Sequence, residues 1–356
     1  MNLEVKGLTI NNQFFTVPEL EKFCREQISG KIRGEWKIDV YRFILDFLGE
    51  SEFILQETSG STGNPKTIQL SKQAMLKSAE NTISFFKLKK NQNAVLCLPV
   101  KYIAGKMMIL RAIMAEMNLI LIEPAGTPDF SNQPEIDFCA MVPMQAANLL
   151  SRNLWPRLKT IILGGSEIRP ELVRQLLTLE TEVFETFGMA ETCSHVALKR
   201  LNGKTPQAFF TALPGISIFT DERDCLVIDA TYLPDKIITN DRVEMLAENQ
   251  FKWLGRIDNV INSGGIKIQA EILEQKIENI LQQNCAVVGI PDVLLGQKPV
   301  LVVESDDELN KEKIIQKLSA EIESKSIPKT IVFLTEIPRN NSFKIDRSKL
   351  RKLIFD

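Results

Sequence analysis

Apolar and polar positions alternate in two different rhythms along this chain. Short apolar runs that predict β-strands lie at 52–56 and 67–70, and then at 93–100, 118–124, 138–142, 160–163 and 182–186. A helix is expected after Ser71, and helical periodicity separates the later runs at 103–116, 144–150 and 170–178. Because this alternation builds a mainly parallel sheet covered by helices, an α/β fold is predicted.

The pattern differs on both sides of this region. Residues 1–50 show only sparse helical periodicity, around 19–26 and 40–48. Residues 195–254 hold short alternating runs at 217–220, 225–230 and 244–253, which predict antiparallel strands. We therefore expect one large domain over residues 1–254, in which antiparallel strands are added to the helix-covered parallel sheet.

The remaining residues predict a second, smaller core. An amphipathic helix at 270–283, a charged helix at 308–324 and strands at 286–290, 299–304 and 330–334 indicate a small α+β domain over residues 259–356. Two domains are the usual arrangement for a chain of 356 residues. Residues 255–258 are expected to form the hinge between them.

Composition narrows the class of protein. A hydrophobic content of 44% and a charged content of 25% are typical of soluble globular proteins, and a net charge of −2 gives no support to nucleic-acid binding. Six cysteines without a C-x-x-C pair argue against a zinc site and against a disulfide framework. No signal peptide is visible, and Arg111 and Glu116 interrupt the most apolar stretch, so we expect a cytoplasmic protein without a membrane span.

The run 57–67 (Glu-Thr-Ser-Gly-Ser-Thr-Gly-Asn-Pro-Lys-Thr) is predicted to bind phosphate. Glycines let backbone N–H groups turn toward an anion, and hydroxyls and lysine add donors and charge. It is not a Walker A loop, because Pro65 separates Gly63 from Lys66. The alternative is an ordinary polar turn. The residues expected at the phosphates are Thr58, Ser59, Gly60, Ser61, Thr62, Gly63 and Lys66.

Two further segments directly follow predicted strands. Residues 163–167 (Leu-Gly-Gly-Ser-Glu) place glycines where a strand ends, which lets a ligand approach the backbone, although a plain turn into a helix is the alternative. Residues 186–192 (Thr-Phe-Gly-Met-Ala-Glu-Thr) end the next strand. Their one carboxylate, Glu191, would be an ordinary glutamate that faces solvent if it were taken alone.

These motifs resemble those of adenylate-forming acyl-CoA synthetases from about residue 52 to the end of the chain. The run 57–67 is similar to the family's phosphate loop, and 186–192 to its aromatic-Gly-Met-Thr-Glu signature. Residues 238–241 (Ile-Thr-Asn-Asp) resemble its Thr-Gly-Asp, and 255–268 its Gly-Arg-x-Asp hinge with a Gly-Gly turn. Residues 338–347 resemble its terminal Thr-x-x-Gly-Lys-x-x-Arg. Ala190, Asn240 and Phe343 depart from the family's residues.

The resemblance implies a role for each matching residue. Phe187 would stack on adenine, Asp241 would accept hydrogen bonds from the ribose hydroxyls, and Glu191 would hold Mg²⁺. Arg256 would contact ribose or phosphate, with a salt-bridged surface arginine as the alternative. The nucleotide-binding residues implied in this way are Gly165, Ser166, Glu167, Phe187, Gly188, Met189, Thr192, Asp241 and Arg256.

In the small domain the resemblance implies three further roles. Lys344 would bridge the substrate carboxylate and the α-phosphate, since a compact ammonium suits developing phosphate charge. The alternative is a solvated surface lysine. Asp258 would be the pivot of the domain, and the turn at Gly264 and Gly265 would approach the pantetheine of coenzyme A.

Residues 98–105 (Leu-Pro-Val-Lys-Tyr-Ile-Ala-Gly) resemble the family's Leu-Pro-x-x-His-x-x-Gly, with Tyr102 in place of the histidine. The chain's single histidine, His195, is expected to be structural. In family members that act on o-succinylbenzoate, a cation at the position of Arg111 faces a substrate carboxylate, and 101–111 looks like that subgroup. Lys106 and Arg111 could instead extend to solvent. The acid-contacting residues implied are Tyr102, Lys106, Arg111 and Gly188.

The resemblance implies a two-step ligase that uses ATP, Mg²⁺ and CoA. A small-molecule carboxylic acid, with o-succinylbenzoate of menaquinone synthesis as the first choice, would form an acyl-adenylate and then a thioester. Another aryl or acyl acid, a carrier-protein acceptor, and a non-catalytic nucleotide-binding module are the alternatives. The oligomeric state stays open, with a homodimer as one option. Because the family's phosphate loop usually lies much further into the chain, a shortened amino-terminal region is expected.

Overall fold

The computed structural model describes residues 5–30, 34–58, 66–306, 310–339 and 345–355. The chain forms two compact units. The first comprises residues 1–165, 175–217 and 229–237, and the second comprises 166–174, 218–228 and 238–356. The predicted hinge at 255–258 lies inside the second unit, and the domain boundary there stays a prediction.

A mixed sheet with a parallel centre organises the first unit. Its strand order is β11-β10-β9-β8-β7-β5-β6-β1-β2. Every pair from β9 to β1 is parallel, whereas β1–β2, β9–β10 and β10–β11 are antiparallel. The strands are β1 (Gly7–Ile10), β2 (Gln13–Thr16), β5 (Asn93–Leu96), β6 (Asn118–Leu121), β7 (Ile136–Met141), β8 (Leu158–Leu163), β9 (Glu182–Gly188), β10 (His195–Arg200) and β11 (Phe210–Ala212). The predicted α/β fold class is confirmed.

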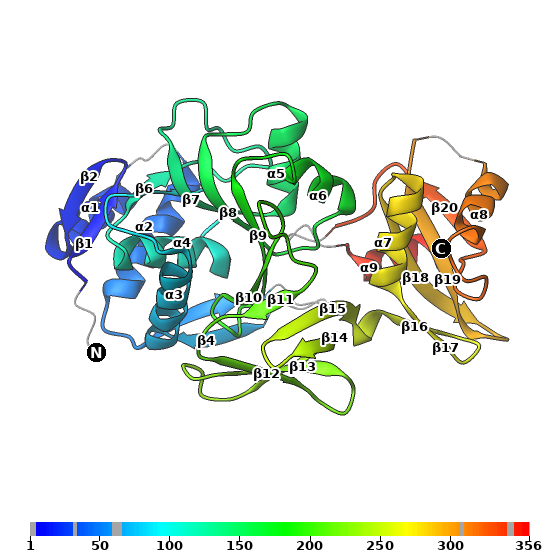
Figure 1. Cartoon of the computed structure of the whole chain (residues 1–356). Helices are drawn as coiled ribbons and strands as arrows, with labels where there is room; N and C mark the ends of the chain where they lie inside the picture. The colour runs from blue at the N-terminus through cyan, green and yellow to red at the C-terminus, as the bar shows by residue number, and fades with distance from the viewer. Residues whose placement is uncertain (1–4, 31–33, 59–65, 307–309, 340–344, 356) are drawn as a thin grey trace. The chain divides into compact units, whose positions relative to one another are not determined.

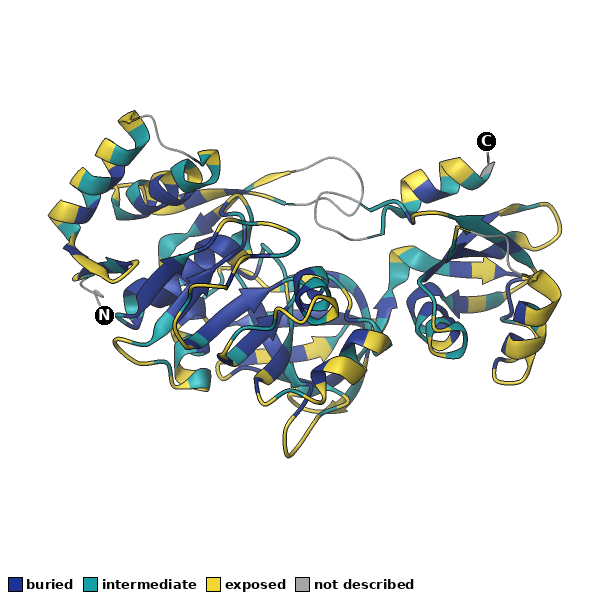
Figure 2. Ribbon diagram, turned by 90° about the horizontal axis from the view of Figure 1, so that it is seen from above, coloured by how far each residue is buried: buried dark blue, intermediate teal, exposed yellow. Residues whose placement is uncertain are grey.

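Helices cover this sheet. The helices are α1 (Val17–Ser29), α2 (Glu35–Leu48), α3 (Lys72–Phe86), α4 (Ile103–Met114) and α5 (Pro143–Ser151). A further helix, α6 (Pro170–Leu176), has most of its residues grouped with the second unit. Helix α4 packs on β1, β5, β6 and β7, and α2 and α3 pack on α4. The chain runs from β7 through α5 to β8, and from β8 through α6 to β9 (Figure 1). Strands β5 to β8 are mostly apolar, and most of their residues are buried (Figure 2).

A separate hairpin of β3 (Phe53–Glu57) and β4 (Thr67–Ser71) flanks the run predicted to bind phosphate. Both strands lie within one residue of the predicted positions. Helix α3 begins directly after Ser71, as predicted, although the Ser71 side chain makes no capping hydrogen bond.

The second unit contains a hairpin and a small α+β core. Strands β14 (Ile237–Ala247) and β15 (Gln250–Arg256) form the hairpin, which leads through the short 3-10 helix η1 (Ile257–Asn259) into the core. The single strand predicted at 244–253 is therefore wrong, because the chain turns back at Glu248 and Asn249. Two short strands, β12 (Ile216–Thr220) and β13 (Cys225–Ala230), precede the hairpin in sequence.

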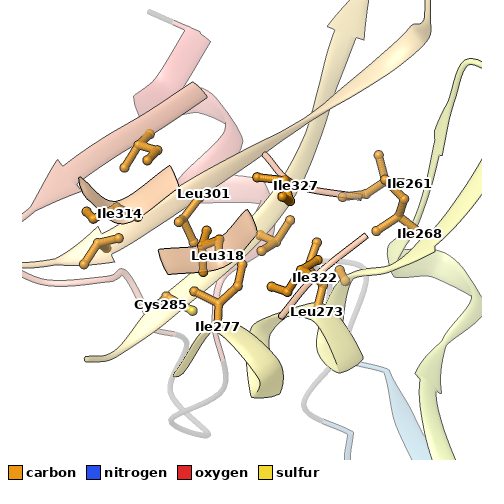
Figure 3. Packing of buried hydrophobic residues seen from close by; sticks show 14 residues of the cluster. Ile261, Ile268, Leu273, Ile277, Cys285, Leu301, Ile314, Leu318, Ile322 and Ile327 are labelled. Atoms are coloured by element: carbon orange, nitrogen blue, oxygen red, sulfur yellow. The ribbon is translucent and has the colours of Figure 1, made fainter. Parts of the chain in front are cut away.

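The α+β core is built on the sheet β17-β16-β19-β18, with β20 paired to β19. Its elements are β16 (Val260–Ser263), β17 (Ile266–Gln269), α7 (Ala270–Leu281), β18 (Cys285–Asp292), β19 (Gly296–Glu304), α8 (Lys311–Ser319), β20 (Thr330–Leu334) and α9 (Arg347–Phe355). Alternate residues of β18 and β19 face opposite sides. Val287 and Leu301 join the cluster with α7 and α8 that Figure 3 shows, whereas Val288 and Val302 join a second cluster with Leu350 of α9.

No helix in the described part of the chain is both long and apolar enough to cross a membrane.

Candidate active site

The two ends of the predicted phosphate loop are held together by hydrogen bonds between Thr58 and Lys66. The N–H of Thr58 donates to the carbonyl of Lys66 at 2.8 Å, which adds one rung beyond the β3–β4 hairpin. The N–H of Lys66 lies 3.4 Å from Thr58 Oγ1, and its side chain is exposed. The predicted residues Ser59, Gly60, Ser61, Thr62 and Gly63 lie outside the described residues.

The carboxyl ends of β8 and β9 lie side by side, because Leu163 pairs with Glu185 in parallel register. Glycine is required at both ends. A Cβ at Gly164 would lie 2.1 Å from Thr186 Oγ1, and a Cβ at Gly188 would lie 2.3 Å from the carbonyl oxygen of Ser194. Gly165 and Gly188 are exposed at the carboxyl edge of the parallel strands, the edge where α/β proteins bind ligands.

Around this edge the structure places several of the predicted nucleotide residues. Gly165 has a φ of +86°, and the half-buried Phe187 ring packs edge-on against Phe210 at 5.7 Å. Met189 is half-buried. Ser166 and Glu167 follow Gly165 directly but are grouped with the second unit.

Glu191 lies in a tight turn that Thr192 closes. The Thr192 hydroxyl accepts from the N–H of Met189 at 3.0 Å and lies 2.7 Å from the carbonyl of Ser194. Thr192 is completely buried, so this geometry assigns it to the turn, and contact with ATP stays a prediction. Glu191 is half-buried, and no described residue forms an ion pair with it.

The donor set around Glu191 suits Mg²⁺ shared with phosphates. Among the described residues, no three His, Cys, Asp or Glu side chains are grouped to hold a metal ion. Mg²⁺ usually keeps several waters and binds one or two carboxylates together with substrate phosphates. Glu191, a single carboxylate without an ion-pair partner among the described residues, fits that pattern.

Arg111 is buried in the last turn of α4, and only 1% of its surface is exposed. Its Nη2 donates to Ser194 Oγ at 2.7 Å, and its Nη1 lies 3.7 Å from the Met108 sulfur. The Nε atom is buried without a partner, and no carboxylate in the described residues pairs with the guanidinium. Burial lowers the pKa of Arg111 to about 9, so the side chain is still a cation at neutral pH. The alternative that Arg111 extends to solvent is wrong.

Lys106, five residues before Arg111 on the same helix, is also buried. Its Nζ donates to the carbonyl of Leu55 at 3.0 Å and to Gln56 Oε1 at 2.8 Å. Burial lowers the pKa of Lys106, while the charges of Asp46 and Glu57 oppose that shift. The ammonium therefore ties α4 to β3 and does not extend to solvent. Contact between Lys106 and the acid stays a prediction.

Tyr102 stands at the N-cap position of α4, with the Lys101 ammonium 5.0 Å from the centre of its ring. Gly105 follows in the first turn, where a Cβ would lie 2.6 Å from the carbonyl oxygen of Pro99. The Pro-Val-Lys-Tyr turn is thus packed directly against α4.

His195 is buried at the start of β10. Its Nε2 lies 3.2 Å from Thr82 Oγ1, and its Nδ1 lies 3.5 Å from Ser194 Oγ. Burial, and then the charge of Arg111, hold the pKa of His195 well below its usual value. His195 is therefore a neutral residue with hydrogen-bonding neighbours, which agrees with the structural role expected from the sequence.

In the second unit, Asp241 is the centre of a polar cluster on the β14–β15 hairpin. Asp241 is buried, and its Oδ1 accepts from Trp253 Nε1 at 3.0 Å. The Nη1 of Arg256 lies 3.5 Å from Asp241 Oδ2, and its Nη2 lies 2.7 Å from Asp258 Oδ2. Arg256 thus bridges Asp241, which is predicted to bind the ribose, and Asp258, which is the predicted pivot.

Asn240 adds a second connection to the pivot. Its Nδ2 donates to both carboxylate oxygens of Asp258, at 3.1 and 3.3 Å, and its Oδ1 accepts from Arg223 Nη1 at 3.1 Å. The departure from glycine at this position therefore supplies a side chain that holds Asp258.

The Gly-Gly turn and the terminal motif belong to the α+β core. Gly264 and Gly265 have φ values of +57° and +84°. Apart from its two chain neighbours, no described residue has an atom within 4 Å of a Cβ built on Gly265. Lys344 lies outside the described residues. Arg347, three residues later, pairs both Nη atoms with Glu274 at 2.7 Å and anchors α9.

The chain matches two known protein families. Residues 50–224 match the AMP-binding enzyme family, and residues 277–344 match the AMP-binding enzyme C-terminal domain. The solved structure of an acyl-CoA synthetase (AMP-forming)/AMP-acid ligase II-like protein from Dyadobacter fermentans is 34% identical, with 94% of this chain and 98% of that chain covered and a TM-score of 0.62. The chain belongs to the AMP-binding enzyme family.

Other AMP-binding enzymes are more distant relatives. The 2-succinylbenzoate–CoA ligase of Staphylococcus epidermidis is 26% identical over 380 residues, which cover 98% of this chain and 76% of that protein. The o-succinylbenzoate coenzyme A synthetase of Bacillus subtilis, solved in complex with ATP and magnesium ion, is 17% identical, with 97% of each chain covered and a TM-score of 0.77. This last likeness shows the fold.

Three side-chain contacts of predicted site residues in this AMP-binding enzyme were not predicted from the sequence. Ser194 holds Arg111, Trp253 holds Asp241, and the side chain of Asn240 holds Asp258. The serine and tryptophan carry no motif signal of their own, since only the fold brings each beside its partner. Asn240 was visible as a departure from the family's glycine.

Proposed function

We propose that this AMP-binding enzyme is an ATP-dependent, AMP-forming acid–CoA ligase whose acid is o-succinylbenzoate, in menaquinone synthesis. Membership of the family supports the ligase, and relatives named 2-succinylbenzoate–CoA ligase support the acid. The observation that carries the choice of acid is the buried Arg111, whose charge has no carboxylate partner among the described residues.

An unpaired buried cation is costly unless a ligand supplies the missing charge. o-Succinylbenzoate carries two carboxylates, so one can react while the other pairs with Arg111. The guanidinium suits this pairing because its Nε and Nη2 edge can bind a carboxylate through two parallel hydrogen bonds. Nη2 carries two protons, of which Ser194 takes one.

In the first half-reaction, a carboxylate oxygen of the acid attacks the α-phosphorus of ATP. The bond from that phosphorus to the bridging oxygen breaks, and pyrophosphate leaves with the electron pair. The residues act by positioning and charge neutralisation, with Lys344 near the reacting carboxylate and α-phosphate and Asp241 at the ribose. Glu191 would hold Mg²⁺ together with the phosphates, and the bound ion supplies positive charge that offsets theirs.

In the second half-reaction the thiol sulfur of CoA attacks the acyl carbon. The bond from that carbon to the AMP oxygen breaks, AMP leaves, and the thiol proton passes to solvent. Asp258 would be the pivot about which the small domain turns between the two steps. The open space at Gly265 supports a role for this turn beside the pantetheine.

The location proposed for the enzyme is the cytoplasm. All six cysteines are buried as free thiols, which is the pattern expected of a protein kept in a reducing compartment.

The test is pyrophosphate release from Mg·ATP with a panel of acids that differ in the second carboxylate. The panel contains o-succinylbenzoate, benzoate, and an aliphatic monocarboxylate. We expect kcat/KM for o-succinylbenzoate to exceed that for the other acids by at least about tenfold. This factor corresponds to the free energy that one hydrogen bond to a charged group contributes. Equal use of benzoate would contradict the proposed acid, and no acid-dependent pyrophosphate with any member would contradict the proposed reaction.

A further inference from the structure

A chain of polar groups lies behind Arg111 in the first unit, and no motif accounts for it; all its members are buried except Ser194, which is half-buried. It runs from Arg111 on α4 to Ser194, then to His195 at the start of β10, and on to Thr82 and Ser78 on α3. We infer that His195 is a positioning residue that, through Ser194, sets the guanidinium of Arg111 for the second carboxylate of the acid. This inference rests on the proposed function.

The geometry defines the direction of each hydrogen bond. The Thr82 hydroxyl donates its one proton to the carbonyl of Ser78 at 3.3 Å, so its oxygen is left to accept from His195 Nε2–H at 3.2 Å. A neutral imidazole that carries its proton on Nε2 has a bare Nδ1. The Nδ1 atom, 3.5 Å from Ser194 Oγ, therefore accepts from the serine hydroxyl.

This arrangement leaves the Ser194 oxygen lone pairs for Arg111. Because the serine proton points to His195, the oxygen faces the guanidinium purely as an acceptor and takes the 2.7 Å bond from Nη2. That bond is the one strong polar contact of Arg111, since the Nη1 contact is to a sulfur and Nε has no partner among the described residues. The orientation of the guanidinium thus depends on the Ser194 hydroxyl, whose proton is directed to His195 Nδ1 at 3.5 Å.

The charges around His195 favour the neutral form that this role needs. Arg111 is the charged group beside the imidazole, and both are buried. Two other titratable groups lie close to the same turn, Cys193 and Tyr232, whose hydroxyl is 3.5 Å from the carbonyl of Thr192. Burial raises the pKa of each to about 12, so both stay uncharged at neutral pH.

A residue that only fills space would affect every acid alike, whereas a residue that sets Arg111 affects only acids that carry the second carboxylate. The discriminating quantity is therefore the ratio of kcat/KM for o-succinylbenzoate to kcat/KM for benzoate. The ratio cancels losses that both substrates share, including a lower fraction of folded enzyme.

The experiment compares His195→Leu with His195→Gln in the full-length enzyme. Leucine removes both hydrogen-bonding atoms at similar size, whereas glutamine keeps one acceptor and one donor. We expect His195→Leu to lower the selectivity ratio roughly tenfold, chiefly through KM for o-succinylbenzoate, and His195→Gln to restore most of it. An unchanged ratio in His195→Leu would overturn the inference.

Ser194→Ala provides the second variant, should His195→Leu fold poorly. It should lower the same ratio by a similar factor, and adding His195→Leu to it should lower the ratio little further, because both changes break one connection. Independent, multiplying effects would overturn the inference. A wild-type enzyme that does not prefer o-succinylbenzoate to benzoate would contradict the proposed function itself, which separates the two failures.

Discussion

The burial of Arg111 indicates the charge of the group that the site binds. A cation fully removed from water, with a free Nε and no acidic neighbour among the described residues, requires a counter-charge from elsewhere. The sequence alone left two hypotheses open for this arginine, because an arginine on an apolar helix can either face a ligand or extend to solvent. Burial decides against the second.

Replacing Arg111 with methionine should raise KM for o-succinylbenzoate roughly ten- to a hundredfold. Methionine keeps an apolar stem, and a desolvated arginine–carboxylate pair contributes on the order of 1.5–3 kcal/mol. KM for ATP should change less, because Arg111 donates to Ser194, which lies beside the nucleotide motif 186–192 and not within it. Steady-state kinetics with each substrate varied in turn measures both constants, and an unchanged KM for the acid would remove the role assigned to Arg111.

Glu191 leads to a second prediction at this scale. Replacing it with glutamine should raise the Mg²⁺ concentration needed for half-maximal pyrophosphate release and lower the maximal rate, because the amide is a much weaker ligand for a hard cation. The exposed Glu180, substituted in the same way, is the matched control and should behave as the wild type. Mg²⁺ titrations of the three proteins compare them, and a wild-type response in Glu191→Gln would show that this carboxylate does not hold the metal.

At the scale of elements, the alternation of apolar strands and amphipathic helices predicted most of the first unit. Strands β5 to β9 and helix α4 lie close to their expected positions because burial of both sheet faces leaves a strong signal in the sequence. The β14–β15 hairpin was missed as a hairpin, since Glu248 and Asn249 give no glycine or proline signal at the turn. Helix α9 was also missed, because its nine residues bury little apolar surface.

Lys106 connects two of these elements and leads to a prediction about them. Its ammonium joins α4 to β3, the strand that precedes the predicted phosphate loop. Lys106→Met should lower the free energy of unfolding by about 1.5–3 kcal/mol, which is the range for hydrogen bonds to a charged group. It should also raise KM for ATP more than KM for the acid, because a displaced β3 moves the loop.

Chemical denaturation and steady-state kinetics of Lys106→Met test this prediction. Lys89→Met, at an exposed lysine after α3, is the control. It should leave the free energy of unfolding within about 0.5 kcal/mol of the wild type and both KM values unchanged. A larger effect of Lys106→Met on the acid than on ATP would instead support direct contact between Lys106 and the acid.

At the scale of the whole molecule, the sequence motifs identified the family and left the contacts to the structure. A polar network within the second unit links Asp241, which is predicted to bind the ribose, to Asp258, the predicted pivot. Arg256 and Asn240 make the connecting contacts. No motif could show it, because the bridging contacts depend on the pairing of β14 with β15. Only the fold shows what the asparagine at 240 does: its side chain donates to the carboxylate of Asp258.

The proposed division of the reaction between two domain orientations predicts a selective effect of Lys344. Lys344→Ala should abolish pyrophosphate release from ATP and acid, because the ammonium would neutralise charge in that step alone. Thioester formation from preformed acyl-adenylate and CoA should persist near the wild-type rate. Separate assays of the two half-reactions measure this, and equal loss of both would contradict the assignment.

A stepwise reaction followed by mass spectrometry tests the central claim most directly. The enzyme is mixed with Mg·ATP and o-succinylbenzoate, first without CoA and then with it. The account predicts o-succinylbenzoyl-adenylate and pyrophosphate in equal amounts before CoA is added, and o-succinylbenzoyl-CoA and AMP afterwards. Formation of ADP and phosphate, or the absence of any acyl-adenylate above the control without acid, would contradict it.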